Sequence, residues 1–459
     1  MSENPSRVQP ARRVAYDVIA AVRESDAYAN LLLPTRIARA GLNTADAGLA
    51  TELTYGTLRM QGYYDRVIAR AAGRPVDRID PPILDVLRLG THQLLSTRVA
   101  PHAAVNESVA LARSVGSRSA TGFTNGVLRE IGRHTPEEWR ERVVADAKNP
   151  DDRLSAITSH PVWVVRAFRR ALEAEGRADE LDALLDADNQ APRVNLIALP
   201  GLADAPDGAQ PDRYSPLGFT MGGGDPQRLV EAADGRVRVQ DEGSQLAALA
   251  LSRSRPVQPG ELWLDLCAGP GGKAALLAAE ASAGGATLIA NELVPARAQL
   301  VRNALAAVPV PVEVWERDGT TVGESEPERF DRILLDAPCT GLGALRRRPE
   351  ARWRKAPRDV AELASLQARL LDSAIAALKP GGVLAYITCS PHLGETRSIV
   401  ADALSRHAGT LESLDTAEVL QSVAVERLDL SGDPARVQLW PHRHNTDAMF
   451  IALLTKRAL

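Results

Sequence analysis

The sequence predicts a multidomain protein with an all-α N-terminal domain, a small α+β connector and a C-terminal α/β domain built on a doubly wound parallel sheet. Apolar residues recur at three-and-four spacing through residues 1–145, as they do on amphipathic helices. Within residues 237–459, compact runs rich in Val, Ile and Leu alternate with helical stretches, which is typical of buried parallel strands. Residues 146–236 show a mixture of both patterns.

Six segments of the N-terminal domain carry the helical spacing: ARRVAYDVIAAV, ADAGLATELTYGTLRM, YYDRVIARAAG, PPILDVLRLGTHQLL, HAAVNESVALARSVG and ATGFTNGVLREIGR. Helix breakers separate them, among them Gly73, Pro75 and Pro101. None of these segments alternates with the period of two that marks a half-buried strand. We therefore expect helices throughout residues 1–145.

The connector and the C-terminal domain differ in the size of the core that each can form. In 146–236 two helical segments lead to one strand candidate, RVNLIAL, and then to a loop rich in Gly, Pro and Asp, so a large separate core is not expected there. In 237–459 the expected strands are LWLDL, ATLIAN, VEVWE, FDRILLD, GVLAYIT and AMFIALL. Ligands of such sheets bind beyond the carboxyl ends of the strands.

Composition and cysteine content exclude several classes of protein. The 459 residues are 45% hydrophobic and 24% charged, and no apolar run approaches the roughly 18–20 residues of a membrane span. The opening MSENPSRVQPARR lacks the apolar stretch of a secretory signal. Cys267, Cys339 and Cys389 have no CxxC spacing, and His442 with His444 alone is a poor metal site. We expect no disulfide, no metal and a reducing, cytoplasmic compartment.

The charge is unevenly distributed along the chain. Residues 1–145 hold 19 Arg, no Lys and 15 acidic residues, so they carry +4 while the remainder carries −8. Arginine suits phosphate because its guanidinium is a planar fork. Genome base composition explains an excess of Arg equally well, so both interpretations stay open.

The first stretch that carries chemistry is LWLDLCAGPGGKAALLA, residues 262–278. A strand ends at Asp265, a glycine-rich loop follows, and a helix opens near Lys273, which places backbone N–H groups where a ligand can approach. The loop is neither GxGxxG nor GxxxxGK[ST]. At the ends of the next two strands, Glu292 is placed to accept hydrogen bonds from ribose hydroxyls and Asp318 to meet an adenine amino group. A tight turn with surface acids is the alternative.

Two further stretches place cysteines at strand ends. FDRILLDAPCTGLGALRRRPEARW (330–353) ends its strand at Asp336 and carries Cys339 in the loop beyond, and GGVLAYITCSPHLGE (381–395) ends its strand next to Cys389. A single buried Cys is usually an apolar core residue. Two thiols past the ends of neighbouring strands, beside a carboxylate, indicate chemistry instead. The run Arg346-Arg347-Arg348 is either a solvated face or, beside this site, a contact for RNA phosphate.

The motifs resemble those of the RNA cytosine-5 methyltransferase family. DAPCTG followed by RRRPEARW, and YITCS after LKPGG, are similar to its two cysteine motifs, and CAGPGGK is similar to its S-adenosylmethionine loop, which more often has Ala at the position of Gly269. HRHNTDAMFIALLTK has Ala448 where the family usually has Gly, and VQDEGSQLAALAL (239–251) resembles the lead into its catalytic domain. Residues 106–131 resemble the NusB-type helical RNA-binding domain that precedes the catalytic domain in bacterial 16S ribosomal RNA methyltransferases of the Sun/Fmu (RsmB) group.

The resemblance implies a NusB-like domain (1–145), a connector with RNA-binding function (146–236) and a Rossmann-like class I methyltransferase domain (237–459). It also implies methyl transfer from S-adenosylmethionine to C5 of a specific cytosine in 16S ribosomal RNA. Cytosine C5 is too weak a nucleophile to react unaided, and a thiolate that adds at C6 makes it enamine-like. By resemblance, Cys389 is that nucleophile and Cys339 assists proton removal and enzyme release, while Asp336 binds the N3/N4 edge and stabilises the protonated adduct.

The same resemblance assigns cofactor contacts to the glycine-rich loop and to the strand ends beside it: Cys267, Ala268, Gly269, Pro270, Gly271, Gly272, Lys273, Glu292, Asp318 and Asp336. The target base would be unpaired or flipped out of its stack. The Arg-rich helical domain would bind the RNA with an affinity that falls as salt rises. We expect a monomer with no membrane partner.

Three alternative functions remain at this stage. A transfer RNA cytosine-5 methyltransferase would use the same catalytic motifs, since these do not encode the substrate; the NusB-like half favours ribosomal RNA. A non-catalytic RNA-binding or antitermination factor would have no need of Cys339, Cys389 and Asp336 together. A small-molecule or protein methyltransferase would have no need of the cysteine pair.

Overall fold

The computed structural model describes residues 8–25 and 27–458. The chain divides into two compact units. The helical unit comprises Met1–Arg166, Leu185–Gln190 and Leu345–Arg354, and the sheet unit comprises Ala167–Leu184, Ala191–Ala344 and Lys355–Leu459. The expectation that no secretory signal is present rests partly on residues 1–7, which lie outside the described residues. The domain boundaries after 145 and 236 remain a prediction.

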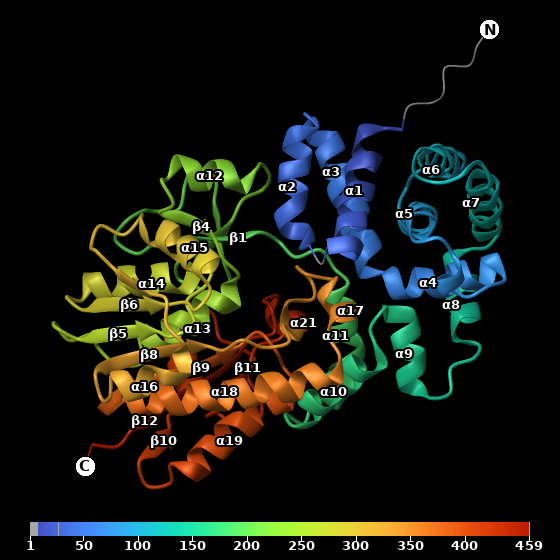
Figure 1. The fold of residues 1–459 in the computed structure, drawn as a ribbon. Helices are drawn as coiled ribbons and strands as arrows, with labels where there is room; N and C mark the ends of the chain where they lie inside the picture. The colour runs from blue at the N-terminus through green and yellow to red at the C-terminus, as the bar shows by residue number, and fades with distance from the viewer. Residues whose placement is uncertain (1–7, 26, 459) are drawn as a thin grey trace. The chain divides into compact units, whose positions relative to one another are not determined.

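The helical unit is built from amphipathic helices that share one apolar core (Figure 1). The bounds of its main helices are α1 Pro10–Ser25, α2 Ala29–Arg39, α3 Thr44–Arg59, α4 Gln61–Ala72, α5 Pro81–Ser96, α6 Pro101–Val115, α7 Arg118–Ile131, α8 Pro136–Val144 and α9 Pro150–Thr158. Val18, Leu53, Ile68, Leu87 and Leu128 are among the side chains buried in the core. Each comes from a different helix, so the apolar faces predicted from the sequence converge in one place.

Local sequence explains where several of these helices begin. Proline occupies the first turn of α5, α6, α8 and α9, where its missing N–H costs no intrahelical bond. The Asn43 side chain accepts from the Asp46 amide at the start of α3, and Thr135 and Glu138 form a capping box on α8. The sequence does not predict α2, because Pro34 lies inside it.

The sheet unit contains an eight-stranded sheet with the order β10-β12-β9-β8-β5-β6-β7, and β11 pairs with β12. Its strands are β5 Leu262–Asp265, β6 Thr287–Asn291, β7 Glu313–Trp315, β8 Phe330–Asp336, β9 Leu378–Thr388, β10 Leu411–Ser413, β11 Val437–Gln438 and β12 Phe450–Lys456. The run from β9 to β7 is parallel. β12 pairs antiparallel with β9, so the expectation of parallel strands holds for the core and not for this last strand.

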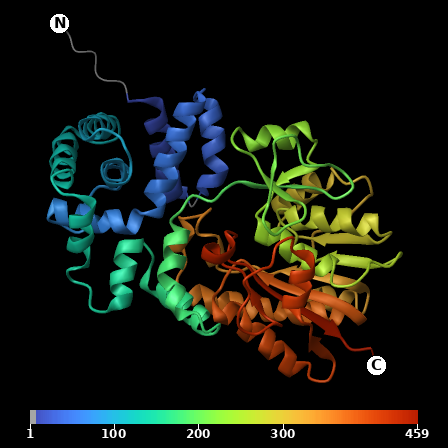
Figure 2. The same ribbon diagram turned by 180° about the vertical axis from the view of Figure 1, so that it is seen from behind.

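Helices cover both faces of this sheet (Figure 1; seen from behind in Figure 2). α13 Glu242–Ser252, α14 Gly272–Ala283 and α15 Pro295–Leu305 lie on one face; α16 Val322–Ser325, α18 Pro357–Ala377 and α19 Arg397–Arg406 lie on the other. Successive strand residues alternate between two cores: Trp263 and Leu334 enter the first, and Leu264, Ile333 and Leu335 enter the second. This alternation follows from the two-residue period of a strand and confirms the doubly wound α/β class.

A second, antiparallel sheet of the sheet unit has the order β2-β3-β1-β4. Its strands are β1 Asn195–Ala198, β2 Gln210–Pro211, β3 Gly218–Thr220 and β4 Val237–Val239, with α12 Pro226–Ala232 in the same region. The expected strand RVNLIAL is β1. The remaining helices are α10 Val162–Glu173, α11 Leu181–Asp188, α17 Ala351–Arg354, α20 Thr416–Val423 and α21 Pro441–His444.

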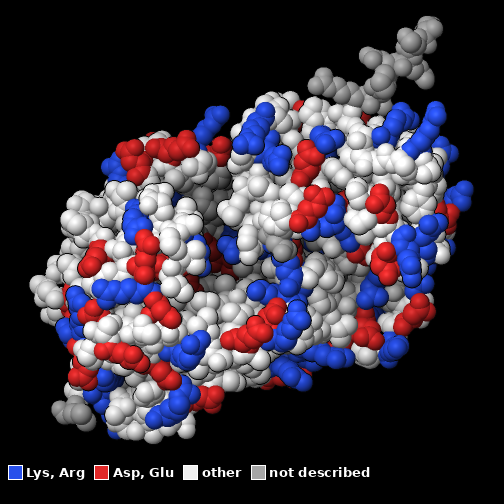
Figure 3. Space-filling model, in the orientation of Figure 1, with Lys and Arg blue, Asp and Glu red and all other residues white. Residues whose placement is uncertain are grey.

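Charge is mixed on the surface. On the face visible in Figure 3, Lys and Arg side chains are interspersed with Asp and Glu. Some cations of the helical unit are paired with acids, as are Arg70 with Asp146 at 2.7 Å and Arg88 with Asp65 at 2.7 Å. Among the described residues, no helix is long and apolar enough to cross a membrane.

Candidate active site of the sheet unit

The two cysteines of the sequence motifs are in contact in the sheet unit. Cys339 lies in the loop after β8 and Cys389 directly follows β9, and these strands are parallel neighbours. Their Sγ atoms are 3.4 Å apart, and both residues are partly exposed. The prediction that both thiols emerge at one edge of the sheet agrees with this geometry. Their catalytic roles remain predictions.

Asp336 and Lys273 form an ion pair beside the thiols. The Nζ atom of Lys273 lies 2.8 Å from Oδ2 of Asp336, joining the start of α14 to the end of β8. Burial lowers the pKa of Lys273, but the charge and hydrogen bond of Asp336 outweigh burial and raise it overall. A negative charge on Cys389 raises this pKa further. Lys273 is therefore a cation placed to stabilise negative charge at this edge of the sheet.

The glycine-rich loop is held by a neighbouring carboxylate. Gly269 donates its amide to Oε2 of Glu292 at 3.2 Å, Val294 donates to the other oxygen at 3.0 Å, and Arg297 donates to the Gly269 carbonyl at 2.8 Å. A Cβ at Gly269 would lie 2.2 Å from Oε2 of Glu292. Glycine in place of the family's more frequent Ala therefore lets Glu292 approach the loop. At Gly271 a positive φ of 105° also favours glycine.

Two further carboxylates lie at the carboxyl ends of β5 and β7, on the side of the sheet that carries the glycine-rich loop and is here called the cofactor side. Asp318, after β7, is exposed and accepts from the amide and hydroxyl of Thr320, which lower its pKa. Asp265, at the end of β5, is 1% exposed, and its carboxyl oxygens lack a well-aligned hydrogen-bond partner. Burial, followed by the charge of Asp336, raises the pKa of Asp265 to about 8, although the Cys267 amide lowers it in part. This raised pKa favours the neutral form of Asp265 near pH 7.

The pKa values of Cys339 and Cys267 are raised above the ordinary range of a thiol. The hydrogen bond with Cys389 and then burial raise the pKa of Cys339, with further contributions from Glu395 and Asp336. Burial raises the pKa of Cys267. Cys339 is therefore suited to proton transfer rather than to attack as a thiolate.

Sequence reasoning missed several polar residues around the cysteines. Glu395 is fully buried and accepts from Thr340 and Ser390, and Gln367 of α18 donates to the Pro338 carbonyl at 2.8 Å. Glu395 is the last residue of the segment 381–395, which contains Cys389 and which the sequence motifs single out. Only the folded loops show that its carboxylate is directed at the neighbours of both cysteines.

The arginine run after the first cysteine motif does not behave as one exposed face. Arg346 is 3% exposed, and its carbonyl accepts from Arg59 within the helical unit. Arg346 is therefore not available to an RNA phosphate, and the expectation of a phosphate contact is wrong for this residue. Arg348 is exposed and lies over the Tyr28 ring at 5.5 Å. Burial of Arg346 accords with the inclusion of Leu345–Arg354 in the helical unit.

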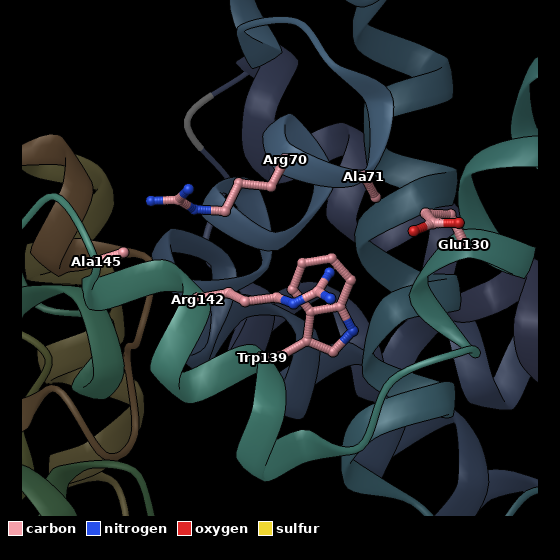
Figure 4. A pocket seen from close by; sticks show the side chains of 6 residues that line it. All are labelled: Arg70, Ala71, Glu130, Trp139, Arg142 and Ala145. Carbon is pink, nitrogen blue, oxygen red and sulfur yellow. The ribbon is translucent and has the colours of Figure 1, made fainter.

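A pocket also opens in the helical unit (Figure 4). Its volume is about 300 Å³, and Arg70, Glu130, Trp139 and Arg142 are among its lining residues. Arg142 lies over the buried Trp139 ring at 5.3 Å, and Arg70 is paired with an acid, so both cations already have partners. No group of three or more His, Cys, Asp or Glu among the described residues could hold a metal ion.

The fold and the site together define a class of protein: a helical unit combined with a largely parallel, mixed sheet of the methyltransferase type that carries paired thiols at its carboxyl edge. Solved structures share this fold. The crystal structure of PH0851 matches with a TM-score of 0.78 at 22% identity, covering 99% of this chain and 100% of that one. The structure of NSun6 from Pyrococcus horikoshii with SFG matches with a TM-score of 0.51 at 17% identity, covering 64% of this chain and 98% of that one.

Sequence comparison is more specific. Residues 255–455 match the 16S rRNA methyltransferase RsmB/F model and residues 9–133 match the NusB family. A chain of Mycobacterium tuberculosis (strain CDC 1551 / Oshkosh), named only as a methyltransferase, is 48% identical over 99% of both chains. The ribosomal RNA small subunit methyltransferase B of Pseudomonas putida is 33% identical over 88% of this chain and 91% of its own. The Bacillus subtilis protein named for the same activity is 30% identical over 97% and 98%. This chain belongs to the RsmB/F family of 16S rRNA methyltransferases.

Proposed function

We propose that this protein methylates C5 of one cytosine in 16S ribosomal RNA, with S-adenosylmethionine as methyl donor and a covalent bond between Cys389 and C6 of the base. The observation that carries the proposal is the 3.4 Å contact between the thiols of Cys339 and Cys389 beside the Lys273–Asp336 ion pair. A methyltransferase acting on an amine or an oxygen has no use for two thiols at this edge. Cytosine C5 requires one thiol to activate the ring and a base to remove its proton.

In the proposed reaction the Cys389 thiolate adds to C6, and the electron pair of the C5–C6 double bond moves to C5. Asp336, at the N3/N4 edge, stabilises the protonated adduct. S-adenosylmethionine supplies the electrophilic methyl group that C5 takes up. Cys339, as its thiolate, then takes up the C5 proton, the C5–C6 double bond reforms, and the Cys389 sulfur leaves as a thiolate. A raised pKa makes the Cys339 thiolate, once formed, a stronger base toward the C5 proton, and the cation at Lys273 would stabilise negative charge on Cys389.

The residues of the cofactor side fit the chemistry of S-adenosylmethionine. The buried carboxyl of Asp265 lacks a well-aligned partner, as expected if a polar ligand group completes its bonding. At Gly272 a Cβ would meet nothing nearer than 3.9 Å, so the start of α14 leaves room for a ligand. Glu292 and Asp318 at the ends of β6 and β7 would accept from the ribose hydroxyls and the adenine amino group. The loop from Cys267 to Lys273 would enclose the remainder.

Relatives support ribosomal RNA as the substrate, since the Pseudomonas putida and Bacillus subtilis proteins are named for the small subunit. The NusB match over residues 9–133 supports RNA binding by the helical unit. A single chain contains all the residues assigned to the reaction, so we propose a monomer. We place the protein in the cytoplasm because bacterial ribosomal RNA is found there.

The proposal is tested by transfer of a labelled methyl group from S-adenosylmethionine to unmodified bacterial RNA that is then separated by size, with Cys389→Ala in parallel. Label in 16S RNA as 5-methylcytosine, absent from the variant, is the expected result. Label in transfer RNA would retain the chemistry and overturn the assigned substrate. No label on either naked RNA or isolated small subunits would favour a non-catalytic RNA-binding factor.

A further inference from the structure

One buried carboxylate connects the two cysteine loops. Glu395 lies in the short turn Leu393–Glu395 and is fully buried. Its Oε1 atom accepts from the Thr340 amide at 2.8 Å, and its Oε2 atom accepts from the Thr340 hydroxyl at 2.5 Å and the Ser390 hydroxyl at 2.6 Å. Gln367 donates to Oε1 at 3.4 Å. Thr340 and Ser390 directly follow the two cysteines in the chain, so this side chain bonds the neighbour of each thiol.

Other hydrogen bonds fix the same two loops. On the other side of Cys339, the Pro338 carbonyl accepts from Gln367 at 2.8 Å. The Gly343 amide donates to the carbonyl of Cys389 at 2.8 Å, which joins the loops directly. A Cβ at Gly343 would lie 2.9 Å from that carbonyl oxygen, so the approach depends on glycine. The cysteines are thus held through their backbones, and their side chains remain free to react.

The bonding of Glu395 is unusual for a buried acid. Its donors are a backbone amide, two hydroxyls and a side-chain amide, all of them neutral. A purely structural link between two loops needs no charge, and burying a carboxylate costs free energy unless its oxygens are fully bonded. Two oxygens with four donors meet that requirement. Four hydrogen bonds to one carboxylate hold the two cysteine loops more rigidly than a single bond would, which suits a site where a small displacement of a loop lowers the reaction rate.

We propose that Glu395 is a positioning residue that locks the Cys339 loop against the Cys389 loop and so sets the separation of the two thiols. This inference rests on the proposed function, because only covalent catalysis by one thiol and proton transfer by the other require a fixed separation. Displacing a reacting group by about 1 Å can cost about 100-fold in rate. The charge of Glu395 also contributes to the raised pKa of Cys339, which makes the Cys339 thiolate a stronger base for the proton transfer that the proposal assigns there.

Disulfide formation between the thiols measures their separation without any RNA or methyl donor. The full-length protein is treated with the two-electron thiol oxidant diamide, which takes up the two electrons and two protons lost when the S–S bond forms. The rate of the Cys339–Cys389 disulfide is then followed by peptide mass spectrometry. Methyl transfer to 16S RNA is measured on the same preparations, as kcat and KM separately.

Three variants separate position from charge. Glu395→Ala removes all four bonds and should slow the disulfide at least about tenfold and lower kcat about 100-fold, with little change in KM. Glu395→Gln keeps one carbonyl for the Thr340 amide and can donate to the hydroxyls of Thr340 and Ser390, so it should remain within about threefold of the wild type in the disulfide rate. Ser390→Ala loses the bond to Glu395 together with the weaker contacts of the Ser390 hydroxyl with the Thr340 hydroxyl and the His392 amide, both at 3.2 Å, and should slow it about fivefold.

Ser373→Ala is the matched control for Ser390→Ala, because Ser373 is a buried hydroxyl in the same unit that bonds to the Gly323 amide instead. It should leave the disulfide rate unchanged. If Glu395→Ala does not fold, the positioning role is tested by comparing the disulfide rate of Ser390→Ala with that of Ser373→Ala. Disulfide rates equal to the wild type in Glu395→Ala or Ser390→Ala overturn the positioning role whatever the enzyme methylates. Absence of methyl transfer by the wild type, with the expected disulfide rates, overturns the proposed function alone.

Discussion

Lys273 and Asp336 join the cofactor side of the site to the cysteine side, with Nζ and Oδ2 2.8 Å apart. Their side chains are only 12% and 29% exposed, so neither charge is fully hydrated. The pair links the first turn of α14 to the carboxyl end of β8. It therefore fixes the position of the carboxylate that we assign to the cytosine edge.

Lys273→Met keeps most of the side-chain volume and removes the charge. Because Asp336 would be left as a partly buried carboxylate without its cation, we expect the free energy of unfolding to fall by roughly 1–3 kcal/mol. Urea unfolding measures the loss. Lys379→Met is the control, since Lys379 pairs with Asp331 at the same 2.8 Å but is 40% exposed and should cost less than about 1 kcal/mol. If Lys273→Met and Lys379→Met lowered the free energy of unfolding equally, the inference that a partly buried Asp336 depends on its cation would be wrong.

The two thiols should have opposite effects on a covalent intermediate. Cys339→Ala removes the group that assists loss of the C5 proton, so a protein–RNA adduct should accumulate and survive denaturing electrophoresis. Cys389→Ala removes the nucleophile, so neither adduct nor product should form. Cys267→Ala serves as a control that should trap no adduct, because Cys267 has no assigned role in covalent chemistry. An adduct with Cys389→Ala would reverse the assignment.

The sequence predicts that the two thiols lie close together, because local apolar patterns show where each of the two strands ends. The strands that end at Asp336 and beside Cys389 are short apolar runs, and parallel strands have their carboxyl ends on one edge. Glu395 and Gln367 escape prediction because a buried hydrogen bond depends on the path of a loop. Nothing in the local pattern around Glu395 indicates that its two oxygens bond the neighbours of both cysteines.

The segment Leu345–Arg354 shows a second limit. Its sequence reads as a basic loop that continues a catalytic motif, yet the structure assigns it to the helical unit. The contacts responsible join residues about 290 positions apart, such as Arg352 and the Arg59 carbonyl. Periodicity and charge describe neighbours in the chain, so they do not reveal packing over this sequence distance. The prediction of a parallel strand was wrong for β12 for a related reason, because an apolar pattern does not indicate the direction of a strand relative to its neighbours.

Arg352 should be essential to the helical unit. It is fully buried, its pKa is lowered to about 10 by burial, and it donates to the carbonyls of Arg59 and Ser159 and to Oδ1 of Asn189. Arg352→Met leaves these acceptors unsatisfied and should cost roughly 3 kcal/mol. Hydrogen exchange should show faster exchange of the amides of the helical unit. Arg348→Met, at an exposed position of the same segment, should change stability by no more than about 0.5 kcal/mol. Similar exchange in both variants would contradict the role of Arg352.

Asp265 should make the protein less stable as the pH rises. Its pKa is about 8 in the folded state, against an ordinary value of 3.8. Below pH 3.8 both states hold the proton, whereas between the two values only the folded state keeps it, so stability falls up to about pH 8 and then levels off.

Asp265→Asn removes this titration, so the stability of the variant relative to the wild type should increase between pH 5 and pH 8, by up to about 4 kcal/mol. Urea unfolding at several pH values provides the measurement. Asp318→Asn is the control: the pKa of Asp318 is lowered by Thr320, so the stability it contributes is lost only on acidification below pH 5. Its difference from the wild type should therefore stay constant over the same range. If the difference in the free energy of unfolding between Asp265→Asn and the wild type were also constant, Asp265 would be ionised in the folded protein. The cofactor would then meet a charged carboxylate at this position and not a neutral carboxyl group.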